Sequence, residues 1–438
     1  MNNQIRLLGN TKDIITPSKF YRVWFNEVEA IVYNCSVGNY ALFSAGGPVH
    51  VEVEILFPFE KVKIRPLSCG IKFYIKGRKV IFDIDEPRKL SFEVDDEIKN
   101  PLFLFINPAE KHIPDMNDSS VIFFEPGKVY EAGLIRLKKG ETVYIGQDAV
   151  VFGSIASDDC DDIKILGRGI LDGSRWPREG ELKELRMIQL INCKNVFIEG
   201  ITVLNGPVWH VVPVGCQDVL IHNINIITYT FGGDGIDLVG CKNVEVDNAF
   251  IRSRDDCIAI KASNYRGRIE GTSNVEKIRI QNSVFWNADL GNALEIGFET
   301  RCDEMKDIAF TNCDIIRCEY EGYMSGATLS IHNGDRAFIH DVKFENIRVE
   351  DSRQKLIDVK VLHAQYSIDE ERGQVKDITF EGIRIVDGPF PVSIIRGFDA
   401  NHQVENILVK DLYAYGRKIN NFLDAKMVAE LCINISFE

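Results

Sequence analysis

The chain repeats a short phrase, which reads NVFIEGI at Asn195–Ile201 and DVLIHNI at Asp218–Ile224. Apolar residues stand at alternate positions of the phrase, which is the period of a β-strand with one buried face. The Asn or Asp that opens the phrase is typical of a turn, because its short side chain bonds nearby backbone groups. Nine copies follow one another at steps of 23 to 36 residues, with their second positions at Ile163, Val196, Val219, Val244, Ile278, Ile308, Val342, Ile378 and Ile407.

A repeat of this length predicts a β-solenoid in which each copy supplies one strand of one coil. A second apolar run follows in several coils, for example at Gly235–Val239 and Cys257–Ala262. Stacked coils pair every strand with those above and below, so we expect a parallel β-helix, and the handedness of parallel connections favours a right-handed one. The alternative interpretation is a β-sandwich whose strand spacing is a coincidence.

The residues before the repeat follow a different pattern. Short alternating strands such as Val51–Ile55 and Ile71–Ile75 are separated by turns and contain no copy of the phrase. We therefore predict an all-β protein in which residues 1–110 form a small β-sandwich and residues 120–438 form the parallel β-helix. The attached sandwich would also cap the terminal coil, whose open edge invites aggregation.

Composition excludes several classes of partner. The 438 residues include 65 acidic and 51 basic ones, for a net charge of −14, which argues against nucleic acid and anionic membranes. No stretch reaches the roughly 18 apolar residues of a membrane span. The first residues lack the layout of a secretory signal, so we expect a cytoplasmic protein, or an extracellular one if a leader was removed. The long edge of a solenoid leaves room for a homo-oligomer.

The cysteines fit a reduced protein. Eleven cysteines, an odd number without a Cys-x-x-Cys pair, favour buried thiols over a disulfide framework. Cys193, Cys216 and Cys241 hold the same position in successive copies of the phrase. We expect them to form a packing ladder, because the His and carboxylate partners of a metal site are missing from that register.

Three carboxylates are brought together by the repeat. Asp234 lies in GGDGID at Gly232–Asp237, and Asp255 and Asp256 lie in RDDCIAI at Arg254–Ile260. If the isoleucines of the two motifs both point inward, Asp234 is level with Asp256 on the next coil, about 4.8 Å away. Like charges this close resist simultaneous ionisation, so at least one pKa should be raised. Glycoside hydrolysis requires such a protonated acid beside ionised carboxylates.

An isolated Asp-Asp pair is more often a solvated turn, but here the interval between the acids resembles that of glycoside hydrolase family 28, the polygalacturonases. That family reads Asn-Thr-Asp-Gly-Ile-Asp and then Asp-Asp-Cys at the same spacing. The resemblance covers about residues 120–350 and includes GRGILDG at Gly167–Gly173 and NGPVWH at Asn205–His210. The N-terminal sandwich is more similar to the dextranases of family 49, which are clan relatives.

The resemblance implies an inverting mechanism and a role for each acid. Asp255 would be the general acid, and Asp234 with Asp256 would hold the hydrolytic water. Catalysis by acids and water needs neither a metal nor another cofactor. A calcium-dependent lyase is disfavoured because it needs a strong cationic base in register with the acids.

Two departures from the family bear on the substrate. Asn292 stands where polygalacturonases have the histidine of Gly-His-Gly, and Thr328–His332 stands where they have Arg-Ile-Lys. A galacturonate carboxylate would then meet Glu295 and a weakly basic His332, which is electrostatically poor. We therefore favour a neutral sugar, although Lys261 and Arg301 could supply a cation from elsewhere.

Further substrate-binding candidates come from strand alternation. Trp209 is in register with Asp234 one coil earlier, where an indole could stack on a sugar ring, although a packing role is the alternative. Other candidates share the face of the three acids or lie in nearby loops, and for these a solvated strand face is the alternative. They are His210, Asp237, Lys261, Tyr265, Asn292, Glu295, Arg301, Tyr320, Tyr323 and His332.

The sequence therefore predicts an inverting glycoside hydrolase that acts on an α-linked oligosaccharide or polysaccharide, with a neutral sugar favoured. The alternative among enzymes is a galacturonide hydrolase of the pectin type. The alternative from another class is a carbohydrate-binding β-helix without turnover. No phosphate-binding glycine loop, zinc-ligand spacing or serine nucleophile elbow is present.

Overall fold

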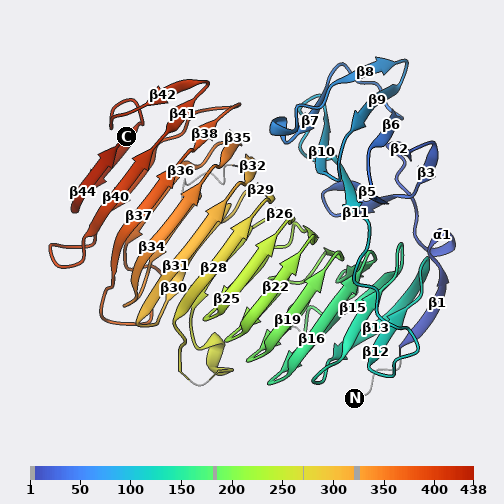
Figure 1. Ribbon diagram of the computed structural model, residues 1–438, viewed down its shortest axis with the longest axis horizontal. Helices are drawn as coiled ribbons and strands as arrows, with labels where there is room; N and C mark the ends of the chain where they lie inside the picture. Colours follow the sequence, from blue (N-terminus) through green and yellow to red (C-terminus); the bar gives the residue numbers. More distant parts are fainter. Residues whose placement is uncertain (1–4, 181–184, 270, 320–325) are drawn as a thin grey trace.

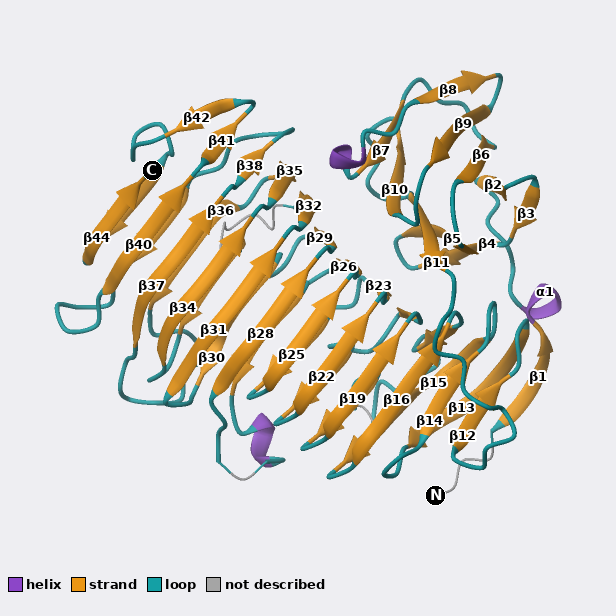
Figure 2. Ribbon diagram, viewed as in Figure 1, coloured by secondary structure: helices purple, strands orange, loops and turns teal. Residues whose placement is uncertain are grey.

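The computed structural model describes residues 5–180, 185–269, 271–319 and 326–438. Figure 1 shows a long stack of coils with a smaller sandwich against one side, and Figure 2 shows that both parts are built from strands joined by loops, with very little helix. The described helical segments are short: α1 (Thr11–Ile14) and the 3₁₀ turns at Leu67–Cys69 and Tyr265–Gly267. Within these residues no helix is long and apolar enough to cross a membrane.

The coils form a parallel β-helix, which confirms the predicted fold class. The copies of the phrase make one face, a 12-stranded sheet in which neighbouring strands are parallel. Its strands are β12 (Val121–Phe124), β14 (Thr142–Ile145), β16 (Asp161–Gly167), β19 (Lys194–Glu199), β22 (Gln217–His222), β25 (Lys242–Asp247), β28 (Val275–Gln281), β31 (Glu304–Thr311), β34 (Phe338–Glu345), β37 (Gln374–Glu381), β40 (Val404–Lys410) and β44 (Cys432–Phe437).

A 22-stranded sheet forms the other two faces, because each typical coil adds two more strands to it. The face toward the sandwich has β17 (Ile170–Asp172), β20 (Thr202–Leu204), β23 (Asn225–Ile227), β26 (Phe250–Ser253), β29 (Val284–Asn287), β32 (Asp314–Cys318), β35 (Arg348–Ser352), β38 (Arg384–Ile385) and β41 (Leu412–Ala414), with β42 (Arg417–Ile419) antiparallel to β41. The last face, here called the acid face, has β18 (Ile188–Ile191), β21 (Val211–Val214), β24 (Ile236–Val239), β27 (Ile258–Ala262), β30 (Leu294–Thr300), β33 (Ala327–Asn333), β36 (Lys355–Val361), β39 (Ser393–Arg396) and β43 (Met427–Glu430). In the first coils the long strands β13 (Lys128–Arg136) and β15 (Val150–Asp158) serve both faces.

The residue that opens each phrase bends the chain. All nine opening residues have a left-handed backbone, with φ between 53° and 61°. Asn and Asp tolerate this conformation better than most residues. Their side chains also bond from coil to coil: Asn195 Nδ2 donates to Asp162 Oδ1 at 2.6 Å, and Asn243 Nδ2 donates to Asp218 Oδ1 at 2.6 Å. These polar rows keep the turns of successive coils aligned.

The cysteine ladder is confirmed. Cys193, Cys216 and Cys241 are buried on successive coils, and Cys193 N donates to Cys216 Sγ at 3.4 Å. All eleven cysteines are free thiols.

The sandwich consists of two five-stranded sheets that share an apolar core. One has β4 (Val32–Cys35), β5 (Gly38–Ala45), β11 (Leu102–Pro108), β10 (Lys89–Val94) and β7 (Val62–Arg65), and the other has β3 (Val28–Ala30), β2 (Tyr21–Phe25), β6 (Val49–Ile55), β9 (Lys79–Ile84) and β8 (Phe73–Lys76). Phe103 and Phe105 of β11 pack on the coils, with ring centroids 5.2 and 5.1 Å from that of Phe250. The sandwich thus covers the outer side of one solenoid face.

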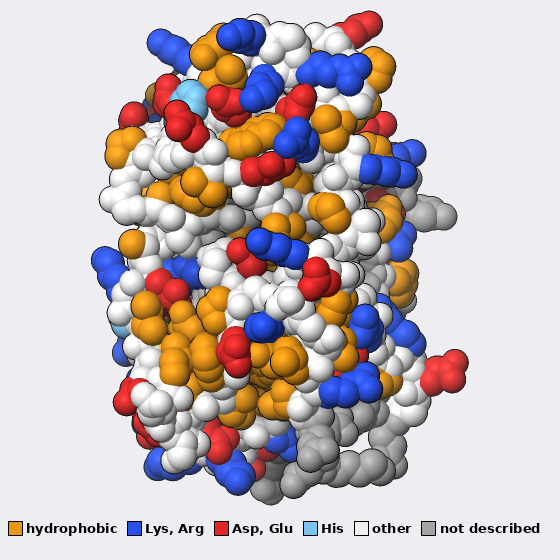
Figure 3. All heavy atoms as spheres, turned by 90° about the vertical axis from the view of Figure 1, so that its right-hand side faces the viewer, with side chains coloured by type: hydrophobic (Ala, Val, Ile, Leu, Met, Phe, Trp, Pro, Cys, Tyr) orange, Lys and Arg blue, Asp and Glu red, His pale blue; other side chains and the backbone are white. Residues whose placement is uncertain are grey.

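The first strand, β1 (Arg6–Asn10), does not belong to the sandwich as the predicted domain 1–110 required. It pairs antiparallel with β13 and so covers the edge of the first coil, which was expected to need a cap. Figure 3 shows this end of the molecule, with apolar side chains grouped on its lower half. Ile5 and Leu7 are 44% and 54% exposed.

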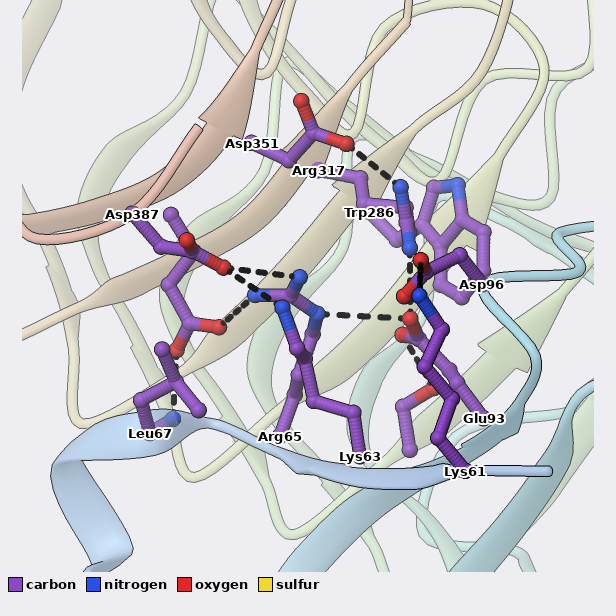
Figure 4. A network of polar contacts seen from close by, with 12 residues as sticks. Lys61, Lys63, Arg65, Leu67, Glu93, Asp96, Trp286, Arg317, Asp351 and Asp387 are labelled. Carbon is purple, nitrogen blue, oxygen red and sulfur yellow. Dashed lines mark hydrogen bonds and ion pairs between the residues drawn. The ribbon is translucent and has the colours of Figure 1, made fainter. Parts of the chain in front are cut away.

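Buried ion pairs join the sandwich to later coils (Figure 4). Arg65 of β7 is 3.3 Å from Glu93 of β10, contacts Glu350 of β35, and is 3.1 Å from Asp387. Glu93 also accepts from Arg317 of β32 at 2.5 Å. A cavity of about 690 Å³ borders this network.

Replacement of Arg65 should therefore be costly. Arg65→Met leaves Glu93 and Glu350, both fully buried, without their shared cation. We expect the free energy of unfolding in a urea titration to fall by about 3 kcal/mol, the usual cost of breaking a buried pair. Lys61→Met, which removes the exposed pair with Asp96, should change it little. An equal loss of unfolding free energy in the two variants would contradict a stabilising role of the buried ion pairs.

Candidate active site

The three acids lie at the starts of two adjacent strands of the acid face. Ile236 pairs with Ile258, as predicted, and Gly235 N donates to Asp256 O at 2.8 Å, which holds Asp234 level with Asp256. The predicted patch on the surface is only partly present. Asp234 and Asp256 are 2% and 6% exposed, and Asp255 alone of the three is partly exposed.

Asp256 is held by the next coil. Its Oδ1 accepts from Asn292 N at 2.8 Å and from Asn292 Nδ2 at 2.9 Å. Asn292 was predicted to bind the substrate, but it is 2% exposed and orients a carboxylate instead. The backbone of Asp255 is fixed as well, because its carbonyl oxygen accepts from Ser253 Oγ at 2.6 Å and from Asn287 Nδ2 at 2.8 Å.

Asp234 is paired with a buried lysine. Lys261 Nζ lies 3.2 Å from Asp234 Oδ2 and 2.8 Å from Asp237 Oδ1. It also lies 3.9 Å from the centroid of the Trp209 ring. Within the described part of the chain, the buried Asp234 Oδ1 has no hydrogen-bond partner. A buried carboxylate oxygen in this state can accept from a water or a hydroxyl group.

Burial raises the pKa of Asp234 and of Asp256 well above the usual range of an aspartate. Neighbouring carboxylates add to the effect, chiefly Asp237 on Asp234 and Asp255 on Asp256, while Lys261 opposes it at both. The prediction that crowding raises at least one pKa is confirmed. The cluster can thus hold a proton at a pH where an ordinary aspartate has lost it.

Gly291 packs directly against the acids. It lies in the turn between β29 and β30 and has a left-handed backbone, with φ +64°. A Cβ atom at this position would stand 2.3 Å from Asp255 Oδ1 and 2.7 Å from Asp256 Oδ1. The residue before Asn292 must therefore lack a side chain for both carboxylates to keep their places.

His210 does not line a subsite, contrary to the prediction. It is fully buried, its Nε2 accepts from Gly206 N at 2.8 Å, and its Nδ1 donates to Asp234 O at 3.0 Å. Burial lowers the pKa of His210 to about 4, so the ring is neutral. Its place is below the acid, where it holds the backbone of Asp234.

Asp237, Glu295 and His332 share the face of the acids, as predicted, but all three are buried. His332 Nδ1 lies 3.0 Å from Glu295 Oε1, and its Nε2 lies 3.0 Å from Asp358 Oδ2. Burial alone would lower its pKa, yet Glu295 and Asp358 raise it to about 9. His332 is therefore a charged group between two carboxylates, and the prediction of a weak base in contact with the substrate is wrong.

The remaining candidates have different places. Trp209 is beside the acids and partly exposed, and its stacking on a sugar stays a prediction. Arg301 lies beyond the opposite end of β30 from Asn292 and pairs with Asp369 at 2.9 Å. Tyr320 and Tyr323 fall outside the described residues.

Sequence reasoning missed two residues, Gly291 and Asp358, and one contact, that of Lys261 with Asp234. Asp358 lies in register with Ser330, so the repeat itself could have located it. A glycine that touches the acids gives no signal in one sequence. The lysine contact depends on a side chain that reaches back along its strand.

A parallel β-helix that gathers carboxylates at adjacent strand starts has the architecture of the glycoside hydrolases that use acids and water. The chain belongs to glycosyl hydrolases family 28, whose family model matches residues 138–414. A probable polygalacturonase of Vitis vinifera is 33% identical over 124 residues, which are 26% of this chain and 24% of that protein. The first curated relatives are matched over 24%, 41% and 54% of their own lengths.

Solved structures share the fold. Dex49A from Penicillium minioluteum superposes with a TM-score of 0.64 at 14% identity, over 93% of this chain and 91% of that one. The family 28 exopolygalacturonase of Yersinia enterocolitica gives 0.56 at 14% identity, over 88% and 96% of the two chains. Both matches cover more of this chain than the coils alone.

Gly291→Ala tests the packing against the acids. Its methyl group must displace the carboxylates of Asp255 and Asp256, so we expect kcat to fall by about 10²-fold, as small misplacements of reacting groups do. Gly232→Ala is a matched control, because Gly232 has φ +61° and open space around its Cβ position. Comparable losses in both variants would attribute the effect to backbone strain instead.

Asp256→Asn should lower activity and raise stability at neutral pH. An Asn oxygen can still accept both bonds from Asn292, and the cost of a buried charge disappears. Because the folded pKa is raised, the wild type binds more protons folded than unfolded and loses stability as pH rises above about 4. In urea titrations the variant should match the wild type near pH 4 and exceed it by roughly 1 kcal/mol or more at pH 7. A variant less stable at pH 7 would refute the raised pKa.

Proposed function

We propose that the protein is an inverting glycoside hydrolase that cleaves an α-linked oligosaccharide or polysaccharide of neutral sugars. The observation that carries the proposal is the cluster of Asp234, Asp255 and Asp256, in which two acids are nearly buried and one is partly exposed. Crowded carboxylates reduce stability, so a surface that only binds sugar has no reason to keep them together.

Each acid has a role that matches its surroundings. Asp255, the partly exposed acid, gives its proton to the glycosidic oxygen as the bond to the anomeric carbon breaks. Water held by Asp234 and Asp256 attacks that carbon from the opposite side and passes a proton to this pair. The unpartnered Oδ1 of Asp234 is the acceptor for that water. Lys261 favours the ionised form of Asp234 against the effect of burial, and Asn292 orients Asp256.

The pairing of the candidate cations supports a neutral sugar. The two cations that the sequence offered for a uronate are paired with carboxylates of the protein: Lys261 with Asp234 and Asp237, and Arg301 with Asp369. His332, the weak base expected there, lies between Glu295 and Asp358. A uronate carboxylate could reach any of them only by displacing an existing partner.

A galacturonide hydrolase is the second candidate. The names of the relatives favour it, since they include a probable polygalacturonase of Vitis vinifera and an exopolygalacturonase of Zea mays. The two candidates differ in one property of the substrate, its carboxylate. Reducing-sugar release from dextran, polygalacturonate and neutral plant oligosaccharides separates them. Release from polygalacturonate alone would reject the neutral sugar, and release from none of the glycans would favour a binding protein.

The acid and base roles predict different responses to the leaving group. Asp255→Asn should lower kcat on the natural linkage by about 10³-fold, but much less on a dinitrophenyl glycoside, whose leaving group needs no proton. Asp234→Asn should lower kcat on both substrates. Asp303→Asn, at a side chain that is 84% exposed, is the control. If Asp255→Asn kept full activity on the natural linkage, another residue would have to be the acid.

The stereochemistry is tested separately by proton NMR of the first product. We expect the anomer opposite to that of the substrate linkage, because one water attacks from the face away from the leaving group. Initial release of the same anomer would exclude this mechanism.

A further inference from the structure

The acid face is covered on the side of the earlier coils. Gln189 and Ile191 of β18 point out from the coil, as do Val212 and Val214 of β21, because their alternate neighbours belong to the solenoid core. A groove that continued across these strands would leave such side chains exposed. Their exposed fractions are instead between 0% and 6%.

The cover comes from the segment after β27. Tyr265 and Ile269, which are 5% and 8% exposed, form one apolar cluster with the outward side chains of β18, β21 and β24. Tyr265 Oη donates to Gln189 Oε1 at 3.2 Å. Tyr265 and Gln189 belong to coils that are three apart, about 14 Å at the spacing of strands. The hydrogen bond therefore fixes the segment after β27 over the strands from β18 to β24.

The cover reaches the reaction centre through Trp209. The centroid of its ring is 6.2 Å from that of Tyr265 and 3.9 Å from Lys261 Nζ, which in turn is 3.2 Å from Asp234 Oδ2. Trp209 is the partly exposed member of the group, which also contains the buried Tyr265 and Ile269. We name these three residues the end wall. It begins within one coil of Asp234, about 4.8 Å along the solenoid axis.

We infer that the end wall makes the enzyme act at a chain end. A polysaccharide that lay along the acid face would have to cross β21 and β18, and the end wall occupies that path. The substrate must therefore end at Trp209, whose exposed part contacts the terminal sugar. Each cleavage then releases one short product from the end of the chain. This inference rests on the proposed function and adds to it the mode of attack.

The products of the wild type test the inference without any variant. Dextran and polygalacturonate are each treated, together with their oligomers labelled at the reducing end, and the first products are sized by chromatography. We expect one short product from the earliest times, and a viscosity of the polymer that falls slowly for each bond cut. A mixture of fragment lengths with a rapid loss of viscosity would overturn the end wall but leave a hydrolase. No hydrolysis of any glycan would remove the proposed function as well.

A variant provides a second test of the inference. Tyr265→Ala opens the end wall and should raise the loss of viscosity per bond cut several-fold, with longer fragments among the first products. Tyr265→Phe removes only the bond to Gln189 and serves where the alanine variant does not fold. Tyr415→Ala, at a tyrosine that is 58% exposed near the last coils, should keep the wild-type pattern. An unchanged pattern in folded Tyr265→Ala would refute the role of the end wall.

Discussion

The spacing between stacked coils is the constraint on which everything else depends. Backbone hydrogen bonds such as that from Gly235 N to Asp256 O fix neighbouring coils in height and in register. Asp234 and Asp256, which are 22 positions apart in the chain, thereby become neighbours. The same bonds hold both carboxylates in a buried place beside other carboxylates, and burial first, then the neighbouring charges, keep their pKa values raised.

Around the acids, each stabilising group comes from a different coil. Lys261 reaches Asp234 from the next coil, and Asn292 bonds Asp256 from the coil after that. His332, between Glu295 and Asp358, repeats the arrangement farther along the same face. The acid face thus carries a row in which buried carboxylates alternate with buried cations.

Periodicity allowed most of the solenoid to be predicted. The phrase located the strands of one face, the inward position of Ile236 and Ile258, and the level of Asp234 with Asp256, because each depends only on a period of two and on stacking. Burial could not be predicted in the same way. Trp209 and Tyr265 close over the acid face from outside the repeat, and a pattern of alternating residues does not tell whether an outward side chain meets water or another segment. His210 and His332 were misjudged for that reason.

The sandwich bridges parts of the solenoid that would otherwise have no contact with one another. It packs on Val129 in the first coils and on Ile316 much farther along, and Arg65 reaches Glu350 beyond that. An array of coils that touch only their nearest neighbours can fray and melt one repeat after another from its ends. Because the sandwich packs across many coils, their unfolding is coupled, and the array should unfold in a single cooperative step. The acids therefore keep their positions until the whole array unfolds.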